Sequence, residues 1–426
     1  MATGTAVGSQ VRERPARAGL LVWWACLTAL LMTACSAGTP AAGSRPRRST
    51  AGAVVPAIAD VRDYRGGLSR RGIMPGPAPV GRPVRLWTHL SPSGQSWPVA
   101  VAGGWALESE NQALVALDLA TGVPAWRAHL AGAPVGPLTV AGHTILVAVG
   151  TDAVQAFSTS NHQQQWLVHG AALGTQVSVQ GHTAYFGTRP EGFSAVDLLT
   201  GAREWQVHVG PANSKHAIVS GMAYVGGDGD SRLTAVDLRT HHVRWRFDTH
   251  SDRVLTPAVA GGTVYVAGVA AGGLAGRHTA LHALDAATGR QQWQFAPPGT
   301  PAMSGFAVGD RDVFIGLDAA SGTVYAVNRD NGRVDWQRSI DEAVDRPALV
   351  GSTLFVGTGT GGLHAFDAAT GEPLWRAAVT GYAEGVVVTG GLAVVATRDA
   401  RDAPGSVTAF VGAADPRLPL ARRSAA

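Results

Sequence analysis

Cysteine and lysine are almost missing from the sequence. The two cysteines, Cys26 and Cys35, lie close together near the N-terminus, so the chain after Cys35 cannot be a disulfide scaffold. Lys215 is the single lysine among 34 basic residues, and charged residues make up 15% of the chain. We interpret the arginine excess as a coding bias and predict no nucleic-acid partner. Glycine, in contrast, is abundant, and 55 glycines favour a turn-rich, all-β chain.

The N-terminus has the parts of a bacterial export signal. Arg12, Arg14 and Arg17 precede a mostly apolar stretch at 18–31, and Leu-Met-Thr-Ala-Cys follows at 31–35. This ending resembles the lipobox of bacterial lipoproteins, although methionine stands where leucine is usual. The resemblance implies a signal peptide over residues 1–34, lipidation of Cys35 and anchoring to the cell membrane on its extracytoplasmic face. The alternative is an uncleaved anchor, because the apolar run is at the short end of the length that spans a bilayer.

Composition divides the rest of the chain into three parts. Residues 35–82 are rich in Ala, Gly, Pro, Ser and Arg without sustained periodicity, which predicts a flexible tether. Residues 83–414 carry the repeats described next, and residues 415–426 form a C-terminal tail. We therefore expect one repeat domain held at a distance from its membrane anchor.

One motif recurs along the repeat region. Its skeleton is Ala-x-Asp-x-x-Thr-Gly-x-x-x-Trp, most complete at Ala283–Trp293. It returns at Ala116–Trp126, Ala156–Trp166, Ala195–Trp205, Ala235–Trp245, Ala326–Trp336 and Ala365–Trp375. A period of about 40 residues indicates a repeat architecture. Each period reads as four short strands separated by turn residues, so we predict the four-stranded antiparallel blades of a β-propeller.

Each residue of the motif has an expected structural role. The Asp accepts N–H groups of the following turn, and the Gly adopts the positive φ that the turn requires. The Trp fills the space between adjacent blades and offers its indole N–H to a backbone acceptor. Blade two is the weakest copy, with Ser158 for Asp and Asn161-His162 for Thr-Gly, and His241 also replaces Gly in blade four.

Two incomplete copies at the ends of the repeat region set the number of blades. Trp87 has no motif before it, whereas Thr408–Val411 begins a motif that has Pro419 in place of Trp. We therefore predict that the strand around Trp87 pairs with the strand around Phe410 and completes an eighth blade, which closes the ring and removes exposed sheet edges. The predicted blade-docking tryptophans are Trp87, Trp126, Trp166, Trp205, Trp245, Trp293, Trp336 and Trp375.

These motifs resemble the PQQ-like repeats of the quinoprotein alcohol dehydrogenase-like propellers. No Gly-His…Trp-Asp pair typical of WD propellers recurs. A lipoprotein with a bare eight-bladed propeller looks like the BamB-type scaffold lipoproteins of the outer-membrane assembly machinery. The resemblance implies a monomeric, non-enzymatic scaffold that binds a protein or peptide partner in the cell envelope, although a repeat specifies fold more than activity.

Two alternatives stay open, a PQQ-dependent oxidoreductase and a solute-sensing or ligand-binding lipoprotein. The resemblance implies that such an oxidoreductase holds its quinone between a tryptophan and a disulfide of adjacent cysteines, with calcium on Glu, Asn and Asp. The sequence has no Cys-Cys pair and lacks long insertions over the propeller. We therefore expect no cofactor, neither PQQ nor calcium, and assign no catalytic residue.

Three further motifs read better as structure than as chemistry. The glycine-rich stretch 357–362 matches a dinucleotide fingerprint but precedes a strand, so it reads as a hairpin turn. Asp228-Gly229-Asp230 lacks the remaining ligands of a calcium loop. Three residues after successive tryptophans stand His129, His169, His208 and Asp248. We expect these four to be exposed ends of outer strands, too far apart to share a metal ion.

The predicted functional surface is the mouth of the propeller channel, where loops enter the first strand of each blade. Alignment by the hairpin glycines places five side chains there: Trp97, Gln176, His216, Arg346 and Glu384. Two long loops, 268–277 and 397–406, follow inner strands of blades five and eight. Since loops on a rigid scaffold often carry binding residues, we expect a recognition patch, against the alternative of ordinary loop polarity.

Overall fold

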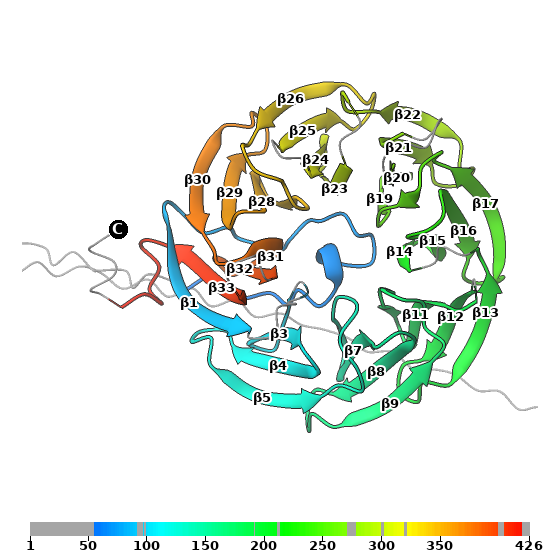
Figure 1. The fold of residues 1–426 in the computed structure, drawn as a ribbon, viewed down its shortest axis with the longest axis horizontal. Helices are drawn as coiled ribbons and strands as arrows, with labels where there is room; N and C mark the ends of the chain where they lie inside the picture. The colour runs from blue at the N-terminus through cyan, green and yellow to red at the C-terminus, as the bar shows by residue number, and fades with distance from the viewer. Residues whose placement is uncertain are drawn as a thin grey trace, which may run out of the picture. The chain divides into compact units, whose positions relative to one another are not determined.

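Eight antiparallel sheets surround a central axis in the computed structural model (Figure 1). The structure describes residues 55–91, 97, 99–190, 192–210, 214–270, 278–299, 302–318, 322–398 and 404–419. The predicted eight-bladed β-propeller is confirmed. The predicted signal peptide, Cys35 and the predicted tether up to residue 54 lie outside the described residues. Within the described part of the chain, no helix has the length and apolar character needed to cross a membrane.

The first four blades follow chain order from the inner strand to the outer strand. Their strands are β2 (Ala100–Ala102), β3 (Trp105–Glu110), β4 (Ala113–Asp118) and β5 (Pro124–His129) in blade one; β6 (Thr139–Ala141), β7 (Thr144–Val149), β8 (Ala153–Ser158) and β9 (Gln164–His169) in blade two; β10 (Ser178–Gln180), β11 (Thr183–Thr188), β12 (Gly192–Asp197) and β13 (Arg203–His208) in blade three; and β14 (Lys215–Val219), β15 (Met222–Gly226), β16 (Arg232–Asp237) and β17 (His242–Asp248) in blade four.

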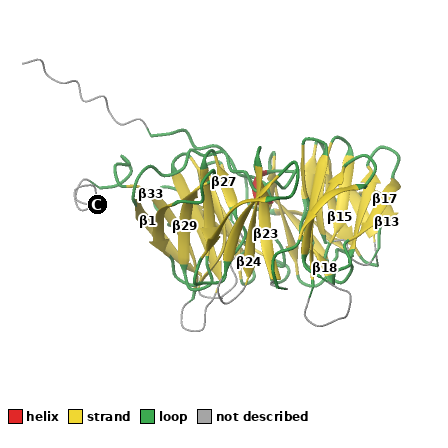
Figure 2. Cartoon of the chain, turned by 90° about the horizontal axis from the view of Figure 1, so that it is seen from above, coloured by secondary structure: helices red, strands yellow, loops and turns green. Residues whose placement is uncertain are grey.

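The next three blades repeat this order, except that blade five has a divided inner strand. Their strands are β18 (Arg253–Val254), β19 (Ala258–Ala260), β20 (Thr263–Val269), β21 (Ala280–Asp285) and β22 (Gln291–Phe295) in blade five; β23 (Ala302–Val308), β24 (Asp312–Asp318), β25 (Thr323–Asn328) and β26 (Val334–Ser339) in blade six; and β27 (Ala348–Val350), β28 (Thr353–Gly357), β29 (Gly362–Asp367) and β30 (Pro373–Ala378) in blade seven. Figure 2 shows the strands running between the two faces of the ring.

Blade eight is built from both ends of the repeat region, as predicted. Its strands β31 (Tyr382–Thr389), β32 (Leu392–Arg398) and β33 (Gly405–Gly412) are followed by the N-terminal strand β1 (Pro83–Ser91). Trp87 stands opposite Ala409, as Trp293 stands opposite Ala283 within blade five. The missing half of each terminal motif is therefore supplied by the other end, and no blade keeps an unpaired half-motif.

The aspartates of the repeat cap the turns that follow them. Asp197 Oδ1 accepts hydrogen bonds from the backbone N–H and the hydroxyl of Thr200, at 2.8 and 2.7 Å. The hydroxyl and the backbone N–H of Thr200, in that order, lower the pKa of Asp197 because they stabilise its charged form. The predicted role of the Asp in the turn is confirmed.

Five of the eight repeated tryptophans donate the predicted indole hydrogen bond to the next blade, whereas Trp126 Nε1 has no partner among the described residues. Trp87 Nε1 donates to the carbonyl of Leu119 in blade one at 2.9 Å, and the same bond joins Trp166, Trp245, Trp293 and Trp336 to the following blade. The turn glycine of that following blade lies against the indole face. A Cβ added to Gly289 would lie 2.6 Å from the Trp245 ring, so this glycine is required by packing as well as by its φ of 72°.

Blades two and four have histidine in place of that glycine, and the imidazole ring packs against the tryptophan of the preceding blade. His162 stacks on Trp126 with 4.1 Å between ring centroids, and His241 stacks on Trp205 at 4.6 Å. Both histidines adopt positive φ, 61° and 60°. Histidine is among the residue types that tolerate the left-handed region, and its ring packs on the indole where glycine would let the backbone approach.

The structure differs from the tether expectation over residues 55–82. Residues 59–77, here called the axial segment, run through the centre of the ring (Figure 1). Their carbonyl groups accept hydrogen bonds in blade order from inner-strand N–H groups of Val101, Val140, Ile218, Val259, Val308 and Leu349. Blade eight bonds to Gly76. The segment shows no periodicity because its hydrogen bonds go to many separate strands, not to one neighbouring strand.

Arg70 attaches the axial segment to blade three. Its fully buried side chain donates to the Tyr64 carbonyl at 2.6 Å and to Ser178 Oγ at 2.5 Å. Ser178 Oγ also lies 2.8 Å from Nε2 of the buried His216, and Asp63 lies 3.9 Å from the guanidinium. With this contact the axial segment bonds to all eight blades, and it places the 3-10 turn η1 (Tyr64–Gly66) on the axis.

Candidate functional site

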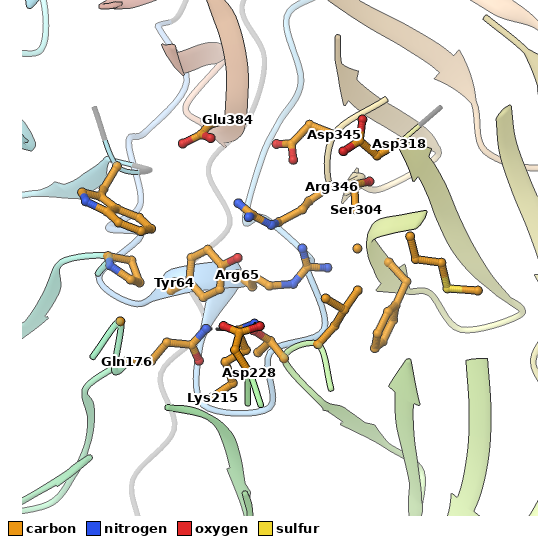
Figure 3. Close-up of a pocket in the computed structure, with 18 of the residues that line it drawn as sticks. Tyr64, Arg65, Gln176, Lys215, Asp228, Ser304, Asp318, Asp345, Arg346 and Glu384 are labelled. Carbon is orange, nitrogen blue, oxygen red and sulfur yellow. Dashed lines mark hydrogen bonds and ion pairs between the residues drawn. The ribbon is translucent and has the colours of Figure 1, made fainter. Parts of the chain in front are cut away.

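A cavity of about 310 Å³ opens at one end of the channel, with η1 as its floor (Figure 3). It lies where the chain enters the inner strands. Arg346, in its lining, precedes β27, whereas the hairpin glycine Gly351 follows that strand. The cavity and the first hairpins are therefore on opposite faces. The axial segment begins on the hairpin face, where Asp60 accepts a hydrogen bond from Gly103 N at 3.1 Å.

Four of the five predicted mouth residues line this cavity. Trp97, Gln176, Arg346 and Glu384 come from blades one, three, seven and eight, and the structure brings them together. His216 is the exception, because it is fully buried beneath the cavity against Ser178. Its neighbour Lys215 lines the cavity instead. Successive side chains of a strand point to opposite sides, so an offset of one residue accounts for this difference.

The cavity lining carries charged side chains of both signs. The cationic members are Arg65, Lys215, Arg253, Arg346 and Arg398, and the anionic members are Asp228, Asp318, Asp345 and Glu384. Sequence reasoning missed most of them. Arg65 lay in the presumed tether, whereas Lys215 carried a usable signal, since it is the single lysine of the chain.

Ion pairs fix the charges at two places on the rim. Lys215 Nζ lies 2.8 Å from Asp228 Oδ1, and Arg253 approaches the same oxygen at 3.8 Å. Across the cavity, Arg398 Nε lies 2.6 Å from Glu384 Oε1. Asp228 therefore serves as a rim anchor, in agreement with the turn reading of 228–230. These partners restrict the rim side chains and leave the centre of the cavity to other groups.

Two arginines occupy that centre. Arg65 projects from η1 and is 9% exposed, while Arg346 is half-buried. Burial lowers the pKa of Arg65, and the positive charge of Arg346 lowers it further. The pKa of Arg346 is raised, chiefly by Tyr64, with smaller contributions from Asp345 and Glu384. The carboxylates of Asp345 and Glu384 thus favour the charge on Arg346, whereas burial is the largest influence on Arg65 and opposes its charge.

Three buried polar atoms of the lining lack hydrogen-bond partners among the described residues. They are Arg65 Nη2, Asp345 Oδ2 and Gln176 Oε1. Asp345 and Gln176 are only 4% and 5% exposed, and burial raises the pKa of Asp345. Buried polar groups are nearly always satisfied by protein, water or ligand. One donor and two acceptors therefore mark the cavity as a place for a polar molecule.

The lining does not fit the quinone and calcium that the sequence resemblance implies for an oxidoreductase. Within the described residues it contains neither the cysteine pair nor an asparagine. Of its carboxylates, Glu384 is paired with Arg398, and Asp345 neighbours Arg346. Arginines beside these two carboxylates disfavour a divalent cation, which binds to carboxylate oxygens that no cation already neutralises. We derive no redox chemistry from this site.

The predicted strand-end residues are exposed, as expected. His129, His169, His208 and Asp248 end the outer strands of four blades. In the described ranges, the one group of three potential ligands near enough to share a metal is His89, Glu108 and Glu110. Ion pairs already involve these residues: His89 lies 3.3 Å from Glu108, and Arg127 lies 2.9 Å from Glu110. We interpret the group as part of the seam between blades eight and one.

The glycine-rich stretch 357–362, which resembles a dinucleotide fingerprint, forms a hairpin turn. Residues 357–362 connect β28 to β29 through a turn in which Thr358 N donates to the Gly362 carbonyl at 2.9 Å. No helix follows this turn in the described chain, so it has no helix terminus for a phosphate. The hairpin reading is confirmed.

Fold and cavity together define an eight-bladed propeller with a plugged channel and a charged axial site. The family model described as outer membrane protein assembly factor BamB matches residues 83–219, 193–346 and 320–413, which span the ring of blades. The chain belongs to this BamB family of PQQ-type repeat propellers.

Curated relatives match parts of the chain. The serine/threonine-protein kinase AfsK of Streptomyces griseus is 30% identical over 190 residues, which cover 42% of this chain and 23% of the kinase. BamB of Bordetella pertussis is 25% identical over 222 residues, covering 48% of this chain and 55% of that protein. The chain therefore spans about a quarter and about half of the lengths of these relatives.

Solved structures confirm the architecture. BamB from Moraxella catarrhalis superposes with a TM-score of 0.61 at 18% identity, covering 77% of this chain and 99% of that one. The quinohemoprotein alcohol dehydrogenase from Comamonas testosteroni gives a TM-score of 0.64 at 13% identity, covering 83% and 80%. At these identities the likeness concerns the fold alone.

Proposed function

We propose that the protein is an exported, lipid-anchored propeller that binds a protein partner in the cell envelope through the face that carries the axial cavity. The observation that carries the proposal is the cavity itself, with ion-paired charges on its rim and unpartnered buried polar atoms at its centre. Such a surface is costly to maintain without a binding partner. Membership of the BamB family supports a scaffold role in protein assembly.

The anchoring part of the proposal rests on the sequence. Residues 1–34 have the pattern of a signal peptide, and Cys35 follows the lipobox-like residues. Just before the axial segment, Ile58 lies beside the turn at Gly390 on the hairpin face. The chain that leads to the anchor thus joins the ring on one face, and the cavity opens on the other. Cys35→Ala should abolish incorporation of labelled fatty acid; retained label would contradict lipidation at this residue.

Reversal of charge at the cavity tests partner binding. We expect Arg346→Glu combined with Glu384→Arg to reduce the yield of cross-linked partner from whole cells at least tenfold. The matched control is Arg338→Glu with Glu372→Arg, which reverses an exposed ion pair of 2.9 Å between outer parts of blades six and seven. Capture that survives the cavity change, or that falls equally in the control, would contradict the proposal.

A further inference from the structure

The centre of the cavity places two guanidinium groups next to one another. Arg65 and Arg346 are neighbours in Figure 3, between the carboxylates of blades six to eight and the Lys215–Asp228 pair. Arg65 is held there by the backbone, because it adopts a left-handed φ of 58° within η1. Gly72 leaves room for its guanidinium, since a Cβ at this glycine would lie 2.7 Å from Arg65 Nη2.

This arrangement is unfavourable without a ligand. Arg65 Nη2 is buried with no hydrogen-bond partner among the described residues, and an unsatisfied buried charged donor has a large desolvation cost. Repulsion from Arg346 adds to that cost. An anion between the two arginines would satisfy the free N–H and cancel the repulsion. Planar guanidinium groups bind carboxylates with two parallel hydrogen bonds.

The surrounding groups select the type of anion. Asp318, Asp345 and Glu384 line the same cavity and repel a dianion such as phosphate more strongly than a single carboxylate. Asp345 Oδ2 and Gln176 Oε1 have no donor among the described residues, so each can accept a hydrogen bond from an N–H group of a ligand. A molecule with one carboxylate beside N–H donors, as in a peptide, meets both requirements.

We propose that the cavity binds a peptide carboxylate between Arg65 and Arg346, with N–H groups of the same peptide donating to Asp345 and Gln176. The inference rests on the proposed function, because it assigns the partner chemistry of the same cavity. A volume of about 310 Å³ lies at the lower end of ligand sites. It accepts a chain end or one acidic side chain and no folded segment.

The test is ligand-observed NMR titration of the folded protein with defined probes. The probes are N-acetyl-dialanine with a free C-terminus, its C-terminal amide, N-acetyl-aspartate amide, acetate and inorganic phosphate. We expect saturable binding of a free-carboxylate peptide and at least tenfold weaker binding of the neutral amide. Preference for dialanine identifies a chain terminus, and preference for the aspartate probe identifies an acidic side chain.

Variants assign the binding to the two arginines. Arg346→Gln and Arg65→Gln should each weaken carboxylate binding at least tenfold, and Arg346→Lys should weaken it less, since lysine keeps the charge without the fork. Arg71→Gln is the control, because Arg71 belongs to the same axial segment but pairs with the exposed Asp310 at 2.9 Å. Circular dichroism confirms folding of each variant. If Arg65→Gln does not fold, Arg346→Gln decides alone.

The outcomes separate this inference from the proposed function. Equal binding of peptide acid and amide, tighter binding of phosphate, or no saturable binding of a carboxylate peptide would overturn the carboxylate site. Partner capture that depends on Arg346 while no probe binds would leave the scaffold proposal intact. Carboxylate binding with partner capture unaffected by the Arg346 change would support a small-solute site and contradict the scaffold proposal.

Discussion

The outer ring and the axis of this propeller are built on opposite plans. In the ring, one arrangement of Ala, Asp, Gly and Trp recurs from blade to blade, and Trp293 forms the same bond to the next blade as Trp87 does. At the axis the surroundings of each arginine differ: Arg70 donates to Tyr64 and Ser178, Arg65 has an unpartnered Nη2, and Arg346 lies near Asp345 and Glu384. Repetition thus produces the fold, and departures from it produce the site.

The largest effect should follow removal of one ring tryptophan. Trp293→Ala deletes an almost buried indole and its bond to the Arg329 carbonyl at 2.9 Å. We expect a loss of about 3–5 kcal/mol in the free energy of unfolding, measured by chemical denaturation. A loss below about 1 kcal/mol would show that blades five and six do not depend on this contact.

At the axis, removal of Arg70 should cost nearly as much. Arg70→Ala breaks the hydrogen bonds to the Tyr64 carbonyl and Ser178, and we expect a loss of about 3 kcal/mol, because hydrogen bonds to charged groups are strong. Arg62→Ala is the control, since Arg62 pairs only locally with Asp60 at 2.6 Å and is half exposed. Equal stability of both variants would contradict a structural role for the axial segment.

A pair of glycine variants separates backbone conformation from packing in the ring. Gly289 and Gly142 both adopt positive φ, but a Cβ would meet the Trp245 ring at the first position and nothing within 4 Å at the second. Gly142→Ala should cost about 1–2 kcal/mol because an L-residue is strained at positive φ, whereas Gly289→Ala should add a further 1–3 kcal/mol or so from overpacking. Similar melting temperatures for the two would contradict the packing role.

Acidification should act on the axis through His216. Burial, with a smaller contribution from Arg70, lowers the pKa of His216 well below its usual value. The folded state therefore resists protonation, and below about pH 6.5 the unfolded state binds one more proton. Stability should fall by about 1.4 kcal/mol per pH unit as pH decreases. His216→Gln should remove the part of this pH dependence that His216 causes. If the free energy of unfolding of the variant, measured by denaturation at several pH values, falls as steeply as that of the wild type, the role assigned to His216 is wrong.

The contrast between the repeated ring and the non-repeated axis also explains which parts of the molecule the sequence could predict. The spacing of the tryptophans and the half-motifs at Trp87 and Phe410 predicted eight blades and their closure, because these residues act within one repeat or between neighbours. Alignment by hairpin glycines found Trp97, Gln176, Arg346 and Glu384, because equivalent loops lie at equivalent places.

The axial segment could not be predicted in this way. Arg65 and Arg70 belong to a stretch that has the composition of a linker, and its partners are distributed over eight strands that are distant in sequence. His216 was placed one residue from the side chain that reaches the cavity, a distinction that alignment by turns does not resolve. Lys215, the single lysine of the chain, was the signal that pointed to the correct residue.

Site-specific photo-cross-linking in cells tests the central claim, which is that the axial cavity binds the partner and the ring of blades only holds the cavity in place. Tyr382 lines the cavity, and Leu374 lies on the outer strand of blade seven and is 52% exposed. With benzoylphenylalanine at either position, we predict a protein adduct from position 382 and none above background from position 374. An adduct from position 374 alone would place the partner on the ring and contradict the account.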